Sequence, residues 1–285
     1  MRIVVLVWKH HVILMCVFHS LQQTGDLVSA RECWEKASQG HRAQNSLWHA
    51  ASALEKAADL SKEAKEYPEM ESLYMSCAEL YLEEGRPQNA AQAVSRAGTA
   101  LSEINPDAAT ALHLNAIKWI AESEKDHMFP DIYRQAILHA VKSRRWEDAV
   151  KVELQFAVSS YSTRGYSTMS KSYLSAIVIA LYSENGVLAW ETYQDALGVP
   201  EFSQSDQAVA AQDLIFAYNK NSKDSLKSAI SRHSCFQFLD NCIIRLVKSI
   251  TNTNIDKTAE SLGRFIATQG LGKIALKEEE EDDLT

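Results

Sequence analysis

Residues 78–97 read AELYLEEGRPQNAAQAVSRA, and this stretch decides the fold. Alanine and leucine recur three or four positions apart on both sides of Gly85, which is the spacing of one face of an α-helix. Glycine tolerates the positive φ of a tight turn, and Pro87 suits the first position of a following helix. The stretch therefore predicts two antiparallel helices joined by a short turn.

The same arrangement of small and large residues returns at a constant interval. A small residue, a large one four positions later and a small one three positions after that recur at intervals of 40 residues in two series. The first series is Ala50-Leu54-Ala57 and Ala90-Val94-Ala97, and the second is Ala109-His113-Ala116, Ala149-Glu153-Phe156 and Ala189-Tyr193-Ala196, whose middle copy is degraded. Small residues let a partner helix approach closely, and the large residue fills the remaining gap. A period of about 40 residues is typical of stacked helical hairpins, and the unit around Gly85 resembles a tetratricopeptide repeat.

The sequence as a whole predicts an all-α protein, a right-handed solenoid of tetratricopeptide-like helical hairpins with a C-terminal helical bundle. Helix boundaries are expected at Pro68, Gly85-Arg86-Pro87, Pro106, Pro130, Gly165, Asn185-Gly186 and Gly198-Val199-Pro200. Four segments follow: an atypical apolar N-terminal segment (1–27), the hairpin array (28–199), the helical bundle (200–269) and a flexible acidic tail (270–285).

The N-terminal segment begins MRIVVLVWKHHVILMCVFHS, two apolar runs separated by Lys9, His10 and His11. Neither run reaches the roughly 20 residues that a membrane-spanning helix requires. Three interpretations stay open: a cleaved signal peptide, a segment that touches a membrane surface, and an aberrant N-terminus that replaces a normal first helix.

Charge and motifs exclude several classes of protein. The formal net charge is −8, and six of the acidic residues lie in the last eight positions, so the rest of the chain is nearly neutral and nucleic acid is not an expected partner. Motifs of zinc hydrolases, serine hydrolases and phosphate-binding loops are absent. We therefore expect no enzyme activity, no cofactor and no metal. Cys235 and Cys242, seven positions apart, are expected on one face of a single helix as small buried hydrophobes rather than metal ligands.

Two charged segments are candidate binding surfaces. The cluster Lys142-Ser143-Arg144-Arg145-Trp146 is expected at a turn, where its cations either complement the negative end of a helix or dock an acidic partner. The tail Glu278–Asp283 carries six consecutive carboxylates and is followed by Leu284. This tail is either a solubility device or a segment that binds a basic partner and inserts Leu284 into it.

Several further segments carry a resemblance that extends from Ala30 to the end of the chain. They are Ala30-Arg31-Glu32-Cys33, Leu47-Trp48-His49-Ala50-Ala51, Leu80-Tyr81-Leu82-Glu83-Glu84-Gly85-Arg86-Pro87, Arg144-Arg145-Trp146-Glu147-Asp148-Ala149, Val199-Pro200-Glu201-Phe202 and Phe238-Leu239-Asp240-Asn241. With these segments in this order and an acidic end, the chain resembles the soluble NSF attachment proteins (SNAPs), most closely their gamma branch.

The resemblance implies an adaptor that binds SNARE complexes (syntaxin-type proteins and their partners) and recruits and stimulates the hexameric ATPase NSF for SNARE disassembly in vesicle-mediated transport. It implies a cytoplasmic location peripheral to vesicle, Golgi or vacuolar membranes. By position, Glu279, Glu280, Glu281, Asp282 and Asp283 match the acidic stretch that faces NSF, and Leu284 matches the leucine that stimulates its ATPase activity. Lys142, Arg144 and Arg145 match a basic turn of the gamma branch, and Arg245 and Lys248 resemble basic positions in its terminal bundle. Contact of these cations with acidic SNARE surfaces is a hypothesis that follows from the resemblance.

The N-terminus departs from the family pattern. The opening helices of the family, and the apolar loop between them that touches the membrane, have no counterpart in residues 1–27. Either the apolar segment substitutes for that loop in peripheral membrane contact, or the first hairpin is missing. The alternative to the adaptor is a generic tetratricopeptide-like scaffold that binds an unrelated peptide, and such a scaffold would tolerate loss of the acidic tail.

Overall fold

The computed structural model describes residues 26–123 and 129–268, with side chains up to residue 263. Most of the apolar N-terminal segment and the whole acidic tail lie outside these residues. Within them the regular elements are helices only, fourteen of them α-helices, so the predicted all-α class is confirmed. The chain divides into two compact units, residues 1–139 and 140–285, which are described separately.

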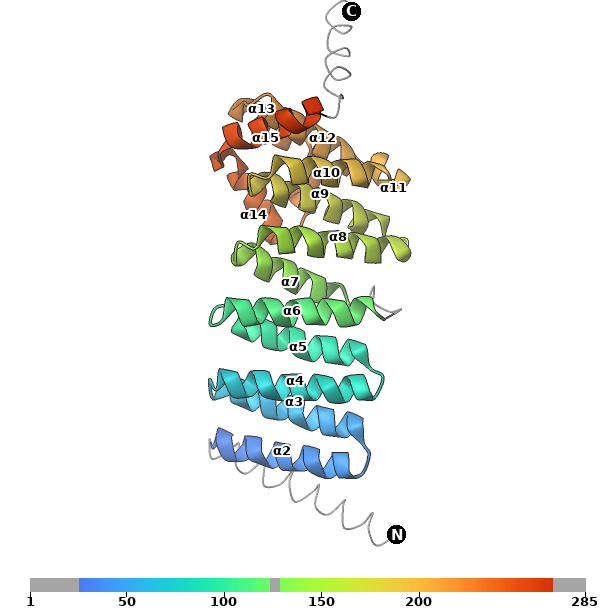
Figure 1. The fold of residues 1–285 in the computed structure, drawn as a ribbon, viewed down its shortest axis with the longest axis vertical. Coiled ribbons are helices and arrows are strands. Elements are labelled where there is room, and N and C mark those ends of the chain that lie inside the picture. Colours follow the sequence, from blue (N-terminus) through green and yellow to red (C-terminus); the bar gives the residue numbers. More distant parts are fainter. Residues whose placement is uncertain (1–25, 124–128, 269–285) are drawn as a thin grey trace, which may run out of the picture. The chain divides into compact units, whose positions relative to one another are not determined.

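The first unit is a stack of antiparallel helices in which each helix packs against the next (Figure 1). Its elements are α2 (Leu27–Ala43), α3 (Leu47–Glu63), α4 (Tyr67–Glu83), α5 (Pro87–Leu101), α6 (Pro106–Ala121) and the larger part of α7 (Pro130–Lys142). This sequential pairing is the tetratricopeptide-like array that the constant period of the sequence predicts.

The second unit is built around α9 (Tyr166–Tyr182), in which every residue from Leu174 to Leu181 is buried. The other elements are α8 (Trp146–Ser162), α10 (Gly186–Leu197), α11 (Pro200–Ser203), α12 (Asp206–Asn219), α13 (Lys223–Arg232), α14 (Asn241–Ser249), α15 (Ile255–Thr268) and the 3₁₀-helices η2 (Ser234–Phe238) and η3 (Ile250–Asn252). Helices α8, α10, α12 and α14 all pack against α9, and α15 packs against α10 and α12.

The helix-to-helix turns repeat one backbone conformation at equal intervals along each unit. Positive φ angles of 56° to 72° occur at Asn45, Lys65 and Gly85 in the first unit and at Arg144, Arg164 and Glu184 in the second. The residue after each donates its N–H to the carbonyl five positions earlier, over 2.8 to 3.0 Å. This is the Schellman arrangement, which satisfies the free carbonyls at a helix end. Two successive helices with their turns make one period of the sequence pattern.

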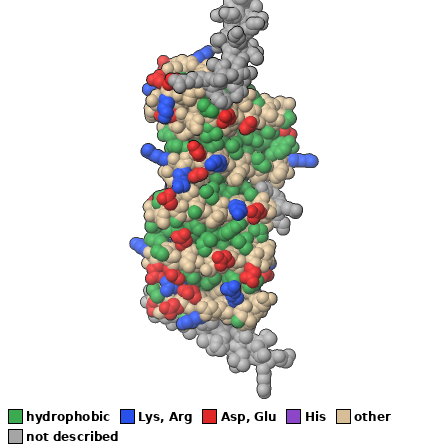
Figure 2. All heavy atoms as spheres, viewed as in Figure 1, with side chains coloured by type: hydrophobic (Ala, Val, Ile, Leu, Met, Phe, Trp, Pro, Cys, Tyr) green, Lys and Arg blue, Asp and Glu red, His purple; other side chains and the backbone are tan. Residues whose placement is uncertain are grey.

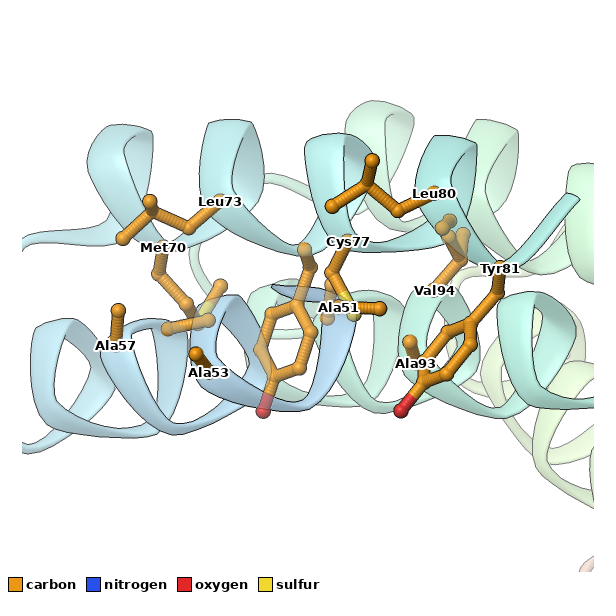
Figure 3. Close-up of a cluster of buried hydrophobic side chains, with 14 of the residues drawn as sticks. Ala51, Ala53, Ala57, Met70, Leu73, Cys77, Leu80, Tyr81, Ala93 and Val94 are labelled. Carbon is orange, nitrogen blue, oxygen red and sulfur yellow. The ribbon is translucent and has the colours of Figure 1, made fainter. Parts of the chain in front are cut away.

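Small side chains of one helix face large side chains of the next in the core of the first unit (Figure 3). Ala53 and Ala57 of α3 lie opposite Met70 and Leu73 of α4, Ala51 lies beside Cys77, and all are buried. Close approach of the two helices follows from the alanines, and the larger side chains fill the space. The packing explanation for the repeated alanines is therefore correct.

Helix boundaries follow the punctuation of the sequence. Proline stands in the first turn of α4, α5, α6 and α11, and Asn105 and Asn185 cap α6 and α10 through their side-chain oxygens. The expectation of one helix carrying both Cys235 and Cys242 is wrong. Cys235 belongs to η2 and Cys242 to α14, because Leu239 and Asp240 between them have extended backbone with ψ of 170° and 146°.

Candidate functional site

The sequence-predicted binding residues fall into three groups, of which two can be located. The acidic group, Glu279 to Leu284, lies outside the described residues. The basic turn at positions 142–145 and the two cations of α14 both lie in the second unit. Their surroundings decide which charges are available to a partner.

The basic turn is the C-terminal end of α7. Arg144 has φ of 56°, its N–H donates to Val141 O at 3.2 Å, and the N–H of Arg145 donates to Ala140 O at 2.9 Å. The turn thus has the Schellman geometry found at the other helix ends, and its cations stand where the helix dipole is negative. The capping role considered for these residues therefore has a structural basis.

The three cations of the turn differ in their freedom to bind a partner. Lys142 and Arg144 are exposed. Arg145 is half-buried, and its Nη1 atom lies 3.6 Å from Asp148 Oδ2 in the first turn of α8. Asp148 therefore partly neutralises Arg145, which leaves Lys142 and Arg144 as the cations most open to an acidic partner.

Helix α14 has one polar face and one buried face. Asn241, Arg245 and Lys248 are exposed and follow one another at helical spacing, so they share a face. The opposite face buries Ile243, Leu246 and Val247 in the second unit. We call the exposed row Asn241, Arg245 and Lys248 the α14 stripe. It carries two positive charges and no acidic residue.

An aromatic side chain precedes the α14 stripe. Phe238, the last residue of η2, is 64% exposed, which is the highest value, together with Val158, among the large apolar side chains of the described residues. Sequence reasoning placed Phe238 in a family-like segment but assigned it no role. An exposed phenylalanine three residues before the α14 stripe adds an apolar side chain at the N-terminal end of this charged row.

The helix that follows the basic turn and the helix that carries the α14 stripe both pack on α9. Helix α8, which follows the turn, and α14 each contact α9. Burial, and secondarily the nearby carboxylates of Glu153 and Asp240, raise the pKa of the Cys242 thiol to about 11. A thiol with so high a pKa stays protonated near neutral pH, so Cys242 is a packing residue rather than a nucleophile.

Polar contacts attach α15, the last described helix, to the turn before α10. Glu184 accepts a hydrogen bond from the backbone N–H of Asn254 and forms an ion pair with Lys257, each at 3.1 Å. These contacts lower the pKa of the Glu184 carboxyl, chiefly through the Lys257 hydrogen bond. The contacts therefore hold the N-terminal end of α15 against the turn before α10.

Tyrosine–carboxylate contacts, which sequence reasoning missed, link α3, α4 and α5 in the first unit. Tyr74 donates to Asp59 at 2.5 Å, Tyr81 donates to Glu55 at 3.3 Å, and Arg96 forms an ion pair with Glu55. Burial raises the pKa of Tyr81 to about 12, so its hydroxyl remains a donor. The sequence did contain one indication of these contacts: Glu55 and Asp59 are four residues apart and therefore share one face of α3. These contacts bind successive helices to one another.

Two histidines from α6 and α7 form a buried pair that sequence reasoning also missed. The rings of His113 and His139 lie 5.2 Å apart, and His139 Nε2 is 2.9 Å from Thr110 Oγ1. Neither ring nitrogen of His113 has a hydrogen-bond partner among the described residues. Burial, and secondarily the neighbouring His139, lower the pKa of His113 to about 4. His113 is therefore neutral at physiological pH.

Other kinds of site find no support in the part of the chain that the structure describes. No group of three or more His, Cys, Asp or Glu side chains in it could hold a metal ion. None of its helices combines the length and apolar character needed to cross a bilayer. On the face shown in Figure 2, acidic and basic side chains are interspersed. The candidate binding groups in these residues are exposed cations and the exposed ring of Phe238.

Comparison with known proteins adds the last observation. Residues 26–254 match the sequence model of the family described as "Soluble NSF attachment protein, SNAP". The gamma-soluble NSF attachment protein of Arabidopsis thaliana is 32% identical over 226 residues, which is 79% of this chain and 77% of that protein. The protein of the same name from Dictyostelium discoideum is 28% identical over 235 residues, 82% of this chain and 72% of its own.

Proposed function

The chain belongs to the soluble NSF attachment protein (SNAP) family, and from this membership we propose that it is an adaptor that binds SNARE complexes and recruits the ATPase NSF to disassemble them. The observation that carries the proposal is the family match over residues 26–254, which includes both groups of basic residues. Proteins of this family are adaptors without catalytic activity of their own. The chain then acts in vesicle-mediated transport, in the cytoplasm at membrane surfaces.

The proposed SNARE contacts are electrostatic. Two groups of cations would face acidic surfaces of the SNARE bundle. The first is Lys142 and Arg144 at the α7–α8 turn, with a smaller contribution from Arg145, and the second is Arg245 and Lys248 on the α14 stripe. Their exposure supports this role, since exposed cations speed the encounter with an acidic partner.

The proposed NSF contacts lie in the tail. Glu279 to Asp283 would face basic surfaces of NSF and raise the association rate, whereas Leu284 would insert into NSF and couple binding to stimulation of ATP hydrolysis.

The decisive experiment measures the ATPase rate of NSF on immobilised SNARE complexes with the intact chain, with Leu284→Ala and with the matched control Leu276→Ala. We expect the intact chain and the control to stimulate NSF, and Leu284→Ala to bind SNARE complexes without stimulating it. Equal stimulation by Leu284→Ala would refute the role of that residue. A folded chain that does not bind SNARE complexes would refute the adaptor function and favour a scaffold for another peptide.

A further inference from the structure

The two positive charges of the α14 stripe are not neutralised by ion pairs with other described residues. Neither Arg245 nor Lys248 forms an ion pair with any residue that the structure describes, whereas Arg232 and Lys257 of the same unit pair with Asp213 and Glu184. The exposed ring of Phe238 stands before the N-terminal end of the stripe. A ligand that fits this surface is an acidic, extended segment with one apolar residue at its end.

The chain itself contains such a segment within reach. Helix α15 starts six residues after α14 ends, and its 14 residues span about 21 Å. The nine residues 269–277 can extend over about 30 Å, which exceeds the length of α15. The carboxylates begin at Glu278, directly after this connection.

The direction and length of the tail also match the surface. A tail arriving at Lys248 would run toward the N-terminal end of α14 and meet Arg245 next. From Glu278 to Leu284 an extended chain covers about 20 Å. The distance from Lys248 along α14 to Asn241 is about 10 Å, and Phe238 is three residues farther along the chain. The acidic part therefore matches the two cations, and Leu284 comes within reach of Phe238.

We propose that, in the free protein, the tail Glu278–Leu284 docks antiparallel along the α14 stripe, with its carboxylates on Lys248 and Arg245 and Leu284 on Phe238. Exposed ion pairs are individually weak, but the tether gives the tail an effective concentration on the order of millimolar. Docking is therefore partial and sensitive to salt. Resting on the proposed function, one consequence is that an acidic SNARE surface competes with the tail and releases it for NSF.

A zero-length carbodiimide cross-link between carboxylates and lysines, applied to the dilute full-length chain alone, tests this proposal. In the monomer fraction at low salt, mass spectrometry should find the tail joined to Lys248 at least about five-fold more often than to Lys223, an exposed lysine of α13 that serves as control. The preference should disappear at high salt. Equal yields at the two lysines would overturn the proposal.

Two variants separate docking from random encounter. Arg245→Glu removes one cation without touching the reacting amine, and should lower the Lys248 yield about three-fold or more while the Lys223 yield stays constant. Phe238→Ala should lower it as well. An unchanged Lys248 yield in both variants would contradict docking. Because NSF and SNARE complexes are absent, a failure of the adaptor function would not alter these results.

Discussion

Gly186, the first residue of α10, lies so close to α15 that a Cβ atom at this position would be 2.7 Å from Leu262 Cγ. The same atom would be 2.6 Å from Ser261 Oγ and 2.7 Å from Thr258 O. Leu262 and Thr258 are fully buried in this contact. The absence of a side chain at position 186 therefore permits α15 to pack on α10.

Replacing Gly186 by alanine should displace α15 and destabilise the second unit. We expect Gly186→Ala to lower the free energy of unfolding by about 1 to 3 kcal/mol, the usual cost of overpacking a tight contact. Urea unfolding followed by circular dichroism measures the change. Gly40→Ala is the control, because a Cβ at position 40 meets no atom within 4 Å and alanine favours the helix α2. A loss in the control equal to that at Gly186 would contradict the packing explanation.

The repeated turns predict opposite effects for two substitutions at equivalent positions. Gly85 and Lys65 have φ of 72° and 61°, and a Cβ at position 85 would meet no other atom. We expect Gly85→Ala to destabilise the chain by about 1 kcal/mol, because a Cβ atom makes positive φ costly. Lys65→Gly should stabilise it by about 0.5 to 1 kcal/mol. Unfolding midpoints that move in the same direction for both variants would refute this account.

Burial of His113 predicts a loss of stability in mild acid. The pKa of His113 is about 4 in the folded chain and 6.5 as a reference, so the unfolded chain binds more protons between these values. Unfolding therefore becomes easier as the pH falls from 6.5 toward 4, with a contribution of about 2 kcal/mol lost by pH 5.

His113→Leu isolates this contribution. The substitution removes two nitrogen atoms that lack hydrogen-bond partners among the described residues. We compare the free energies of unfolding of the natural chain and the variant by urea titration from pH 7.5 to 5. As the pH falls, the natural chain should lose stability relative to the variant. A difference that stays constant with pH would show that His113 does not titrate in this range.

Charge reversal at the basic turn tests its proposed SNARE contact. Arg144→Glu should reduce the association rate with SNARE complexes about three- to ten-fold at low salt and much less at high salt, because the effect is long-range. Glutamate fits this backbone, since Glu184 occupies the equivalent turn with φ of 61°. Lys65→Glu is the matched control in the first unit, and stopped-flow fluorescence gives both rates. Equal slowing by the control would remove the basic turn from the interface.

The positions of most helices could be predicted from the sequence, but the backbone conformation of the turns between them could not. Proline in the first helical turn and alanine at helical spacing identify the helices, because both residue types act locally. The shared turn conformation was harder to see. Of its six occurrences only the one at Gly85 uses glycine, whereas arginine, lysine, glutamate and asparagine occupy the others. Hydrogen bonding of the chain, rather than residue type, imposes positive φ there.

Features that join distant segments were the ones that sequence reasoning missed. His113 and His139 come from different helices, as do Tyr74 and Asp59, so only the packed structure reveals their contacts. Phe238 and the α14 stripe depend on a break in the helix at Leu239 and Asp240, which residue types alone did not indicate. The candidate binding residues, in contrast, were predicted from resemblance and charge.

Turns of the same backbone geometry recur at equal intervals, so a whole hairpin can be removed or added without changing the turns beside it. Asn45 and Gly85 close their helices with the same backbone geometry, and one complete hairpin, α3 with α4, lies between them. Excising residues 46–85 would join Asn45 directly to Arg86, so that α5 would follow α2 with the turn between them intact. Proteins built this way can change length by whole hairpins during evolution, through duplication or deletion of a segment, without inventing a new connection.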